Sequence, residues 1–195
     1  MKKEDLRVQK TKNAIRGAFI ELVEQKGYKK VTVSDIVSKA NINRNTFYLH
    51  YQDKEDLIEQ VISELSKKTI AAFDSFYKDR KTTLHLINEA QIRVWFRFFL
   101  HISKPDVELY RVIMVDQSLR GYILFLYDTI KKHLQDLLNI KNARSNIVFE
   151  YSFNGMVGVF NQWVTYSIIN DNQTTKILAH LAYESLRTFK DINDE

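Results

Sequence analysis

Residues 31–62, with the sequence VTVSDIVSKANINRNTFYLHYQDKEDLIEQVI, decide the fold expected for this chain. Apolar residues recur from Val33 to Ala40 at the i, i+3, i+4 and i+7 positions of one helix face. Phe47 then falls five residues after Ile42, on the side that faces the interior. A longer apolar stripe follows. The stretch therefore predicts two short helices around a tight turn, and then a longer third helix.

Small polar residues mark the ends of these helices. Thr32 with Asp35 three residues later has the spacing of a capping box, in which both side chains bond the backbone at a helix start. Asn41 stands where the chain must turn, and asparagine tolerates the left-handed conformation. Asn43 is a favourable N-cap for the second helix, and Asp53 for the third. The pattern is typical of a helix-turn-helix module.

The second short helix, about residues 44–50, carries side chains that suit nucleic acid. A recognition helix presents its N-terminal residues to base edges in the major groove. Arg44 can bond O6 and N7 of guanine, and Asn45 can bond N6 and N7 of adenine. The alternative for Arg44 is a contact with phosphate alone. At the start of the preceding helix, the hydroxyls of Thr32 and Ser34 suit a phosphate, although Thr32 can also serve only as a cap.

The runs TVSDI, ANINRNTFYLHY and DKEDL within this stretch resemble the DNA-binding domain of TetR-family bacterial transcription regulators. The preceding helix, with apolar residues between Ala14 and Val23 and Gly27-Tyr28 after it, is similar to the family too. The resemblance covers roughly residues 8–60, and the remainder agrees in length and helical character. It implies an all-α protein that binds DNA as a regulator.

The resemblance also implies roles for individual side chains. The matching tyrosine and histidine of the family often contact the DNA backbone, as does the matching lysine, so Tyr48, His50 and Lys54 are expected to be phosphate anchors. The alternative for His50 is a structural cap at the helix end. Thr46 matches a position that serves packing or DNA. The residues predicted to contact DNA are Thr32, Ser34, Arg44, Asn45, Thr46, Tyr48, His50 and Lys54.

Charge is distributed unevenly along the chain. Residues 1–50 have a net charge of +6, whereas residues 51–195 have a net charge of −1. Neutralisation of phosphates supplies most non-specific DNA affinity, so the basic excess lies where the helix-turn-helix module requires it. A lysine-rich solvated surface is the alternative explanation. The basic excess lies in the same segment as the helix-turn-helix motif, which favours DNA binding.

Composition favours helices connected by short loops throughout the 195 residues, with one proline, five glycines and no cysteine. We expect a helix-turn-helix domain over 1–53 and a helical effector-binding and dimerisation domain over 54–195, linked by the helix at 54–77. Nine helices are predicted, at about 7–25, 33–40, 44–50, 54–77, 84–102, 105–114, 118–138, 146–169 and 174–190.

The second half is rich in aromatic residues. In the family, the middle helices of the second domain enclose a small-molecule pocket, and aromatic walls with a few polar groups suit such a site. The alternative for each aromatic residue is a place in the helical core. The candidate ligand-binding residues are Trp95, Phe99, His101, Tyr110, Phe125, Phe153 and Asn154.

The last two helices are expected to form a homodimer, because family members pair these helices across a two-fold axis. Residues 147–169 are apolar almost all round, which indicates burial on more than one side. Gly155 and Gly158 are costly inside a helix, so close approach of another backbone is one reason for them, and a kink is the other. With Trp163 they resemble a pattern of one subgroup, the dihydroxyacetone-kinase-regulator-like proteins.

Other classes of protein fit the sequence less well. The five histidines have no metal-binding spacing, and no nucleotide-binding or hydrolase motif occurs, so we expect neither an enzyme nor a cofactor. No apolar run reaches the roughly 18 residues that span a bilayer, and no secretory signal occurs, so a cytoplasmic protein is expected. The favoured function is a homodimeric repressor of an inverted-repeat operator, controlled by a small-molecule effector. The alternative is a ligand-binding or adaptor protein of the same fold that acts through a protein partner.

Overall fold

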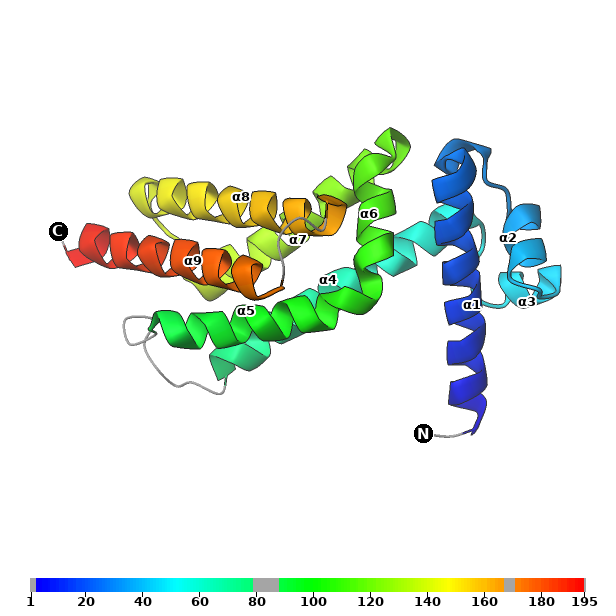
Figure 1. The fold of residues 1–195 in the computed structure, drawn as a ribbon, viewed down its shortest axis with the longest axis horizontal. Helices are drawn as coiled ribbons and strands as arrows, with labels where there is room; N and C mark the ends of the chain where they lie inside the picture. Colours follow the sequence, from blue (N-terminus) through cyan, green and yellow to red (C-terminus); the bar gives the residue numbers. More distant parts are fainter. Residues whose placement is uncertain (1–2, 79–87, 167–170, 195) are drawn as a thin grey trace. The chain divides into compact units, whose positions relative to one another are not determined.

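The computed structural model describes residues 3–78, 88–166 and 171–194 of the chain (Figure 1). Within these ranges the regular secondary structure is helical and contains no strand, which confirms the all-α expectation. Short 3₁₀ turns lie at Tyr28–Lys30 (η1), Lys104–Asp106 (η3) and Gln117–Leu119 (η4). The helices are α1 (Lys3–Lys26), α2 (Val33–Lys39), α3 (Arg44–Tyr48), α4 (Lys54–Lys78), α5 (Glu89–Ser103), α6 (Val107–Val115), α7 (Arg120–Leu137), α8 (Ala143–Tyr166) and α9 (Asp171–Asp194).

The predicted caps of the helix-turn-helix stretch are confirmed. The Thr32 hydroxyl accepts from the Asp35 amide at 3.2 Å, and the Asp35 carboxylate accepts from the Thr32 amide at 2.8 Å. Asn41 has φ 51°, the left-handed conformation that the turn requires. The Asn43 side chain accepts from the amide of the second residue of α3 at 2.9 Å. Asp53 Oδ1 accepts an amide in the first turn of α4 at 2.7 Å.

Several helix starts differ from the sequence-based expectation, and α1 and α9 begin at Lys3 and Asp171 instead of near residues 7 and 174. The prediction that α8 begins near residue 146 is wrong, because Asn142 Oδ1 accepts from the Ser145 amide at 2.8 Å and caps a helix that begins at Ala143. Ser145 is therefore a buried residue of the first turn. Helix α5 begins after Asn88, whose side chain accepts from the Gln91 amide at 3.0 Å. The predicted start of that helix near residue 84 lies outside the described residues.

The helices form two compact units. The first comprises residues 1–64 and 108–125, so α6 and the start of α7 belong with the helix-turn-helix segment. The second comprises residues 65–107 and 126–195. Phe19, Ile36 and Phe47 are completely buried in the first unit. Their burial is the force that holds α1, α2 and α3 together, at roughly 1.5–3 kcal/mol for each large side chain.

The second unit is organised around an aromatic core. Helix α9 packs against both α5 and α8 (Figure 1). The buried cluster includes Trp95 and Phe96 of α5 together with Leu178 of α9. The Trp95 indole N–H donates to the carbonyl of Ala72 at 3.2 Å, so its polar atom is satisfied inside the core.

No helix in the described part of the chain combines the length and apolar character that crossing a membrane requires. Over the same ranges, no three acidic or histidine side chains come together as metal ligands.

Candidate nucleic-acid interface

One side chain of α3 is buried and holds the helix in place, while several others are exposed to solvent. Phe47 is completely buried, and its ring meets the ring of Tyr51 at a centroid distance of 5.6 Å. Burial raises the pKa of Tyr51 to about 12, so this phenol stays neutral in the core. Arg44, Asn45 and Tyr48 are exposed on the opposite side. The structure therefore brings the predicted base-reading residues to one outward face.

Two of these exposed side chains contact each other. The Arg44 guanidinium donates to the Tyr48 hydroxyl at 3.2 Å, and its central carbon lies 5.7 Å from the centroid of the Tyr48 ring. A guanidinium has five N–H donors, so one such bond leaves capacity for base or phosphate oxygens. The contact orients the Arg44 side chain along α3.

The start of α2 is occupied by its own cap. The Thr32 hydroxyl donates to the Asp35 carboxylate at 2.6 Å while it accepts the Asp35 amide. A hydrogen bond from Lys26, at 2.7 Å, and those from Thr32 lower the pKa of Asp35 to about 2. The cap is therefore ionic as well as hydrogen-bonded. Ser34 is exposed one position into the helix.

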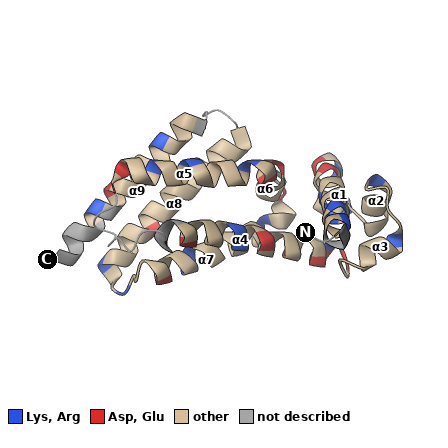
Figure 2. Ribbon diagram, turned by 90° about the horizontal axis from the view of Figure 1, so that it is seen from below, with Lys and Arg blue, Asp and Glu red and all other residues tan. Residues whose placement is uncertain are grey.

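The remaining predicted contacts lie at the edge of this face. Thr46 and His50 are half-buried. The His50 ring lies 6.3 Å from the Tyr51 ring, and its carbonyl accepts from the Gln60 side chain at 3.2 Å. Lys54 is different, because its ammonium points inward and donates to the carbonyls of the turn before α2. Figure 2 shows the other basic positions along α1 and on α2 and α3.

Leu49 is a candidate that the sequence analysis did not single out. It is 79% exposed, between Tyr48 and His50 on the chain. An apolar side chain in this place suits a thymine methyl group. Its position in the sequence could have indicated this exposure. Phe47 and Tyr51, two residues away on either side, are the buried residues here, so Leu49 points away from the core.

The predicted ligand-binding residues are divided between the units. The rings of Trp95 and Phe99 stack with a centroid distance of 5.5 Å and an interplanar angle of 10°. The Phe99 ring also lies 5.6 Å from the Phe160 ring of α8. Phe153 is buried beside Phe149 at 5.9 Å. Trp95, Phe99 and Phe160 thus form a packed aromatic layer of the second unit, and Phe149 and Phe153 form a further stacked pair in the same unit.

The other candidates lie apart from this layer. Tyr110 is buried in α6, within the first unit, and Phe125 is 62% exposed at the end of that unit. Asn154 is exposed on α8 and donates to the carbonyl of Glu150 at 2.7 Å. His101 is exposed and lines a surface cavity of about 390 Å³ between α5 and α9. The cavity is also lined by Arg97, Leu100, Lys104, Asn172 and Thr175.

The fold and the exposed face of α3 define a helix-turn-helix protein, and part of the chain is similar to a known family. The family described as "Bacterial regulatory proteins, tetR family" matches residues 15–61. The regulator YxbF of Bacillus subtilis is 45% identical over 62 residues, which span 31% of this chain and 16% of that protein. The dhaKLM operon activator DhaS of Lactococcus lactis is 21% identical over 120 residues, 62% of this chain and 58% of DhaS. The chain thus spans less than two thirds of either relative.

A solved structure agrees in fold over almost the whole chain. A TetR-family regulator from Syntrophomonas wolfei superposes with a TM-score of 0.68 at 15% identity, covering 94% of this chain and 97% of that chain. Residues 15–61 therefore carry the DNA-binding domain of the TetR family of bacterial regulators, and the rest of the chain shares the fold of the solved structure. The two relatives and the solved structure named above are all described as transcription regulators.

Proposed function

We propose that this protein is a repressor that binds an inverted-repeat operator as a homodimer and releases it when a small-molecule effector binds. The observation that carries the proposal is the outward face of α3, where Arg44, Asn45 and Tyr48 are exposed beside buried Phe47. Two such faces must lie about 34–36 Å apart to enter successive major grooves. An effector that favours another separation shifts the population toward a dimer that does not bind DNA.

The direct test is to sequence the DNA fragments that the purified protein selects. We expect an inverted repeat whose half-sites are about one helical turn apart. Failure to select any sequence would refute operator binding and favour action through a protein partner. A reporter gene placed downstream of the selected site then shows whether the protein represses or activates transcription. DhaS is named as an activator, and activation of the reporter would overturn the repressor assignment.

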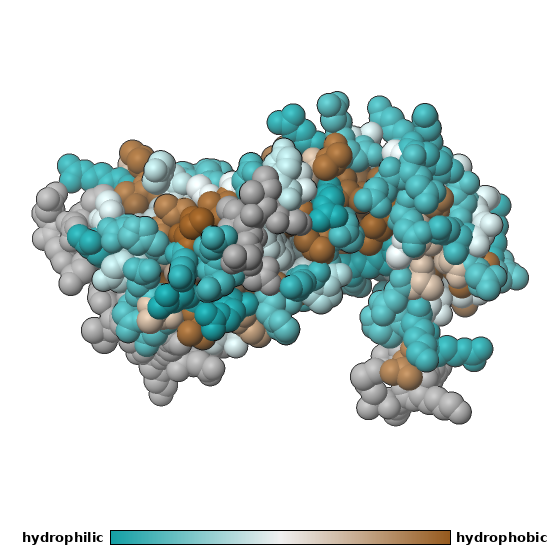
Figure 3. Space-filling view, viewed as in Figure 1, coloured by the Kyte–Doolittle hydropathy of each residue, from teal (hydrophilic) through white to brown (hydrophobic). Residues whose placement is uncertain are grey.

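The dimer proposal is supported by an open apolar groove on α8 and α9. Figure 3 shows hydrophobic side chains gathered over these helices. The groove has a volume of about 860 Å³, and Ile147 and Tyr151 along it are 69% and 80% exposed. Leu181 of α9 lines the other side. A contiguous exposed apolar surface of this kind is typical of a protein interface. A second copy of the chain is its proposed occupant.

The glycines of α8 support the same occupant. A Cβ atom at Gly155 or Gly158 would meet nothing within 4 Å among the described residues, so close packing inside the chain does not explain them. Each costs up to about 1 kcal/mol relative to alanine in a helix. We propose close approach of another chain as the reason for them, and a kink in α8 is the alternative. Gly158→Arg should therefore convert the dimer into a monomer, measured by sedimentation at micromolar concentration.

A matched control for this substitution lies on α7. Gly121 is also exposed in a helix, and a Cβ atom there also meets nothing within 4 Å. Gly121→Arg should leave the protein dimeric. A Gly158→Arg protein that stays dimeric would refute the α8–α9 interface.

The effector proposal rests on the aromatic layer of the second unit and on its low charge. Residues 147–169 contain a single acid, Glu150, and no Lys or Arg. A mostly apolar or aromatic effector is therefore proposed. Coupling of about 1–3 kcal/mol would change DNA affinity by roughly 5- to 150-fold. A thermal-shift screen of cationic dyes, phenolics, fatty acids and sugar phosphates, followed by DNA titrations, tests it, and stabilisation by sugar phosphates alone would refute the apolar effector.

A further inference from the structure

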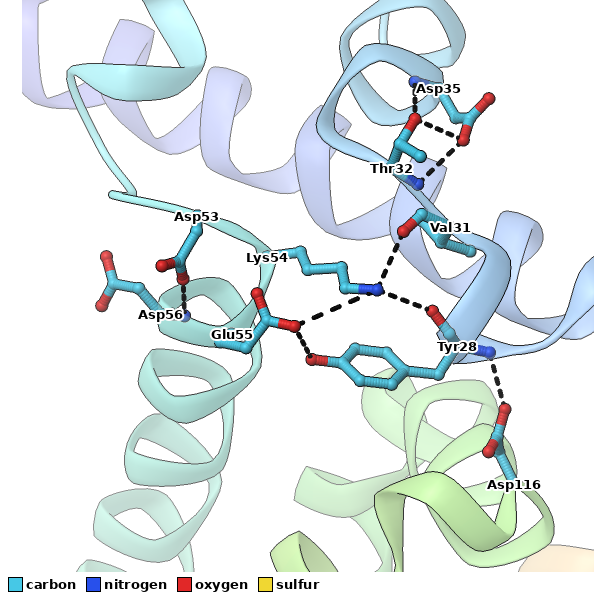
Figure 4. Close-up of polar contacts among 9 residues, drawn as sticks. All are labelled: Tyr28, Val31, Thr32, Asp35, Asp53, Lys54, Glu55, Asp56 and Asp116. Atoms are coloured by element: carbon cyan, nitrogen blue, oxygen red, sulfur yellow. Dashed lines mark hydrogen bonds and ion pairs between the residues drawn. The ribbon is translucent and has the colours of Figure 1, made fainter.

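Tyr28 is bonded to two segments that lie far from it in the sequence (Figure 4). Its backbone amide donates to Asp116 Oδ2 at 2.7 Å, across 88 residues. Its hydroxyl donates to Glu55 Oε1 at 3.1 Å, and its carbonyl accepts from Lys54 Nζ at 3.1 Å. The η1 turn before α2 is therefore bonded both to the first turn of α4 and to the α6–α7 corner, residues 116–119. All of these residues belong to the first compact unit.

The ammonium of Lys54 is committed to this network. It also donates to the carbonyl of Val31 at 3.0 Å, and it lies 4.5 Å from the centroid of the Tyr28 ring. Glu55 Oε1 is 4.0 Å away. An ammonium has three N–H donors, and two of them already serve carbonyls here. With 18% of its side chain exposed, Lys54 is placed to hold the turn, not to present its charge to a phosphate.

Asp116 holds the other side of the same turn. Its carboxylate accepts the amides of both Tyr28 and Ser118, the latter at 2.8 Å. Burial opposes ionisation, but these two amide bonds prevail and lower the pKa of Asp116, so it is a carboxylate at neutral pH. Gly27 has φ 78°, and the position of a Cβ atom there would lie 3.6 Å from Asp116 Oδ2. The turn thus places its backbone directly against the corner.

We propose that Tyr28, Lys54 and Asp116 form a polar joint, and that Lys54 and Asp116 set DNA affinity as positioning residues without contacting DNA. The joint fixes α2, and through it α3, relative to the first turn of α4 and the α6–α7 corner. This inference rests on the proposed DNA binding. It assigns Lys54 a different role from the phosphate contact expected from the sequence, and it adds Asp116, which no sequence motif marks.

The substitution Asp116→Asn tests the joint by whether it weakens or strengthens DNA binding. A carboxamide has one acceptor oxygen, so it can serve only one of the two amides that the carboxylate serves. The apparent DNA affinity falls in proportion to the fraction of molecules in which α3 keeps the orientation that binds DNA. Because the substitution lowers this fraction, we expect binding to become about 3- to 30-fold weaker. Removing a negative charge would by electrostatics alone strengthen DNA binding. Weaker binding therefore supports the joint, and unchanged or stronger binding overturns it.

Glu24→Gln provides the matched control. Glu24 is an exposed acid on α1, so this variant loses the same charge from the same unit. We expect its affinity to be equal to or slightly above that of the wild type. If it weakens binding as much as Asp116→Asn does, the effect follows charge and not the joint, and the proposal fails.

The salt dependence of binding tests the role of Lys54. Loss of one phosphate contact reduces the slope of log K against log salt concentration by about 0.9. Lys54→Met keeps an unbranched aliphatic side chain, and we expect it to weaken binding while leaving the slope unchanged. A reduction of about 0.9 in Lys54→Met would show a phosphate contact and overturn its assignment as a positioning residue.

Hydrogen exchange on the full chain without DNA separates this proposal from the proposed function. In Asp116→Asn the amide of Tyr28 should exchange faster than in the wild type, and exchange should also rise across α2 and α3. Exchange at Tyr28 that equals the wild type would show that the joint does not exist. If the wild type selects no DNA at all, DNA binding fails as the proposed function, while the exchange result still decides the joint.

Discussion

The helix-turn-helix segment and the aromatic layer of α5, α8 and α9 are built in opposite ways. In the first, one ring is buried and its neighbours are exposed, as at Phe47 and Arg44. In the second, several rings pack on one another, as at Trp95 and Phe99. An exposed residue of the first segment, such as Arg44, can be replaced without changing the fold. A residue of the second can be replaced only by disturbing its neighbours.

Trp95→Ala should produce the largest effect, because it removes the centre of the packed layer. Trp95 is 6% exposed, and its ring meets those of Phe73 and Phe96 at 4.4 and 4.6 Å. We expect a loss of about 3–5 kcal/mol in the free energy of unfolding, measured by urea denaturation. Phe98→Ala, at a side chain that is 47% exposed, should cost much less. Equal, small losses would mean that Trp95 lines a cavity instead of filling a core.

Arg44→Ala should have the next largest effect, and on specificity instead of stability. One good bidentate base contact is worth roughly 1–3 kcal/mol of discrimination. We therefore expect the ratio of operator affinity to random-DNA affinity to fall, with the unfolding free energy unchanged. Tyr48→Phe should weaken both affinities more evenly. A wild-type ratio in Arg44→Ala would remove Arg44 from base readout.

Thr32→Ala should have a smaller effect, confined to the cap of α2. Loss of an N-cap side chain costs about 0.5–2 kcal/mol. The ionic part of the same cap depends on Asp35. Since the pKa of Asp35 is lowered in the folded state, its contribution to stability is present above pH 3.8 and is lost as the pH falls toward about 2. The unfolding free energy of Asp35→Asn, measured across this pH range, should therefore depend less on pH than that of the wild type. An identical acid dependence would mean that Asp35 makes no ionic contribution to the cap.

Gly17→Ala should give the smallest effect, and a favourable one. A Cβ atom at Gly17 of α1 meets nothing within 4 Å among the described residues. Alanine is better than glycine in a helix by up to about 1 kcal/mol. The melting temperature should rise slightly with no change in the oligomeric state. A fall would indicate that Gly17 is covered by another chain, as proposed for α8.

The sequence predicted those features of the fold that depend on neighbouring residues. The Thr32 cap and the Asn41 turn each depend only on residues within four positions of them in the sequence, and the structure contains both. The start of α8 lies three residues before the expected position, because Asn142 caps the helix and serine or asparagine can each serve as an N-cap. Element order and most boundaries followed from apolar periodicity.

The sequence could not predict features that depend on distant residues. The inward position of Lys54 is set by carbonyls 23 and 26 residues earlier, and the bond between Tyr28 and Asp116 spans 88 residues. Neither leaves a periodic pattern. The aromatic residues raised a similar difficulty, because composition does not distinguish a side chain that fills a core from one that lines a ligand pocket.

The single buried anchor of α3 has a consequence for how such a protein changes over evolutionary time. Phe47 holds the helix, while positions 44, 45, 48 and 49 carry side chains that are exposed to solvent. Substitutions at these four positions can accumulate with little loss of stability, since surface changes usually stay within about 0.5 kcal/mol. A duplicated copy of the gene can therefore acquire a new operator while keeping its scaffold. The same separation makes α3 a practical target for directed reprogramming of DNA specificity.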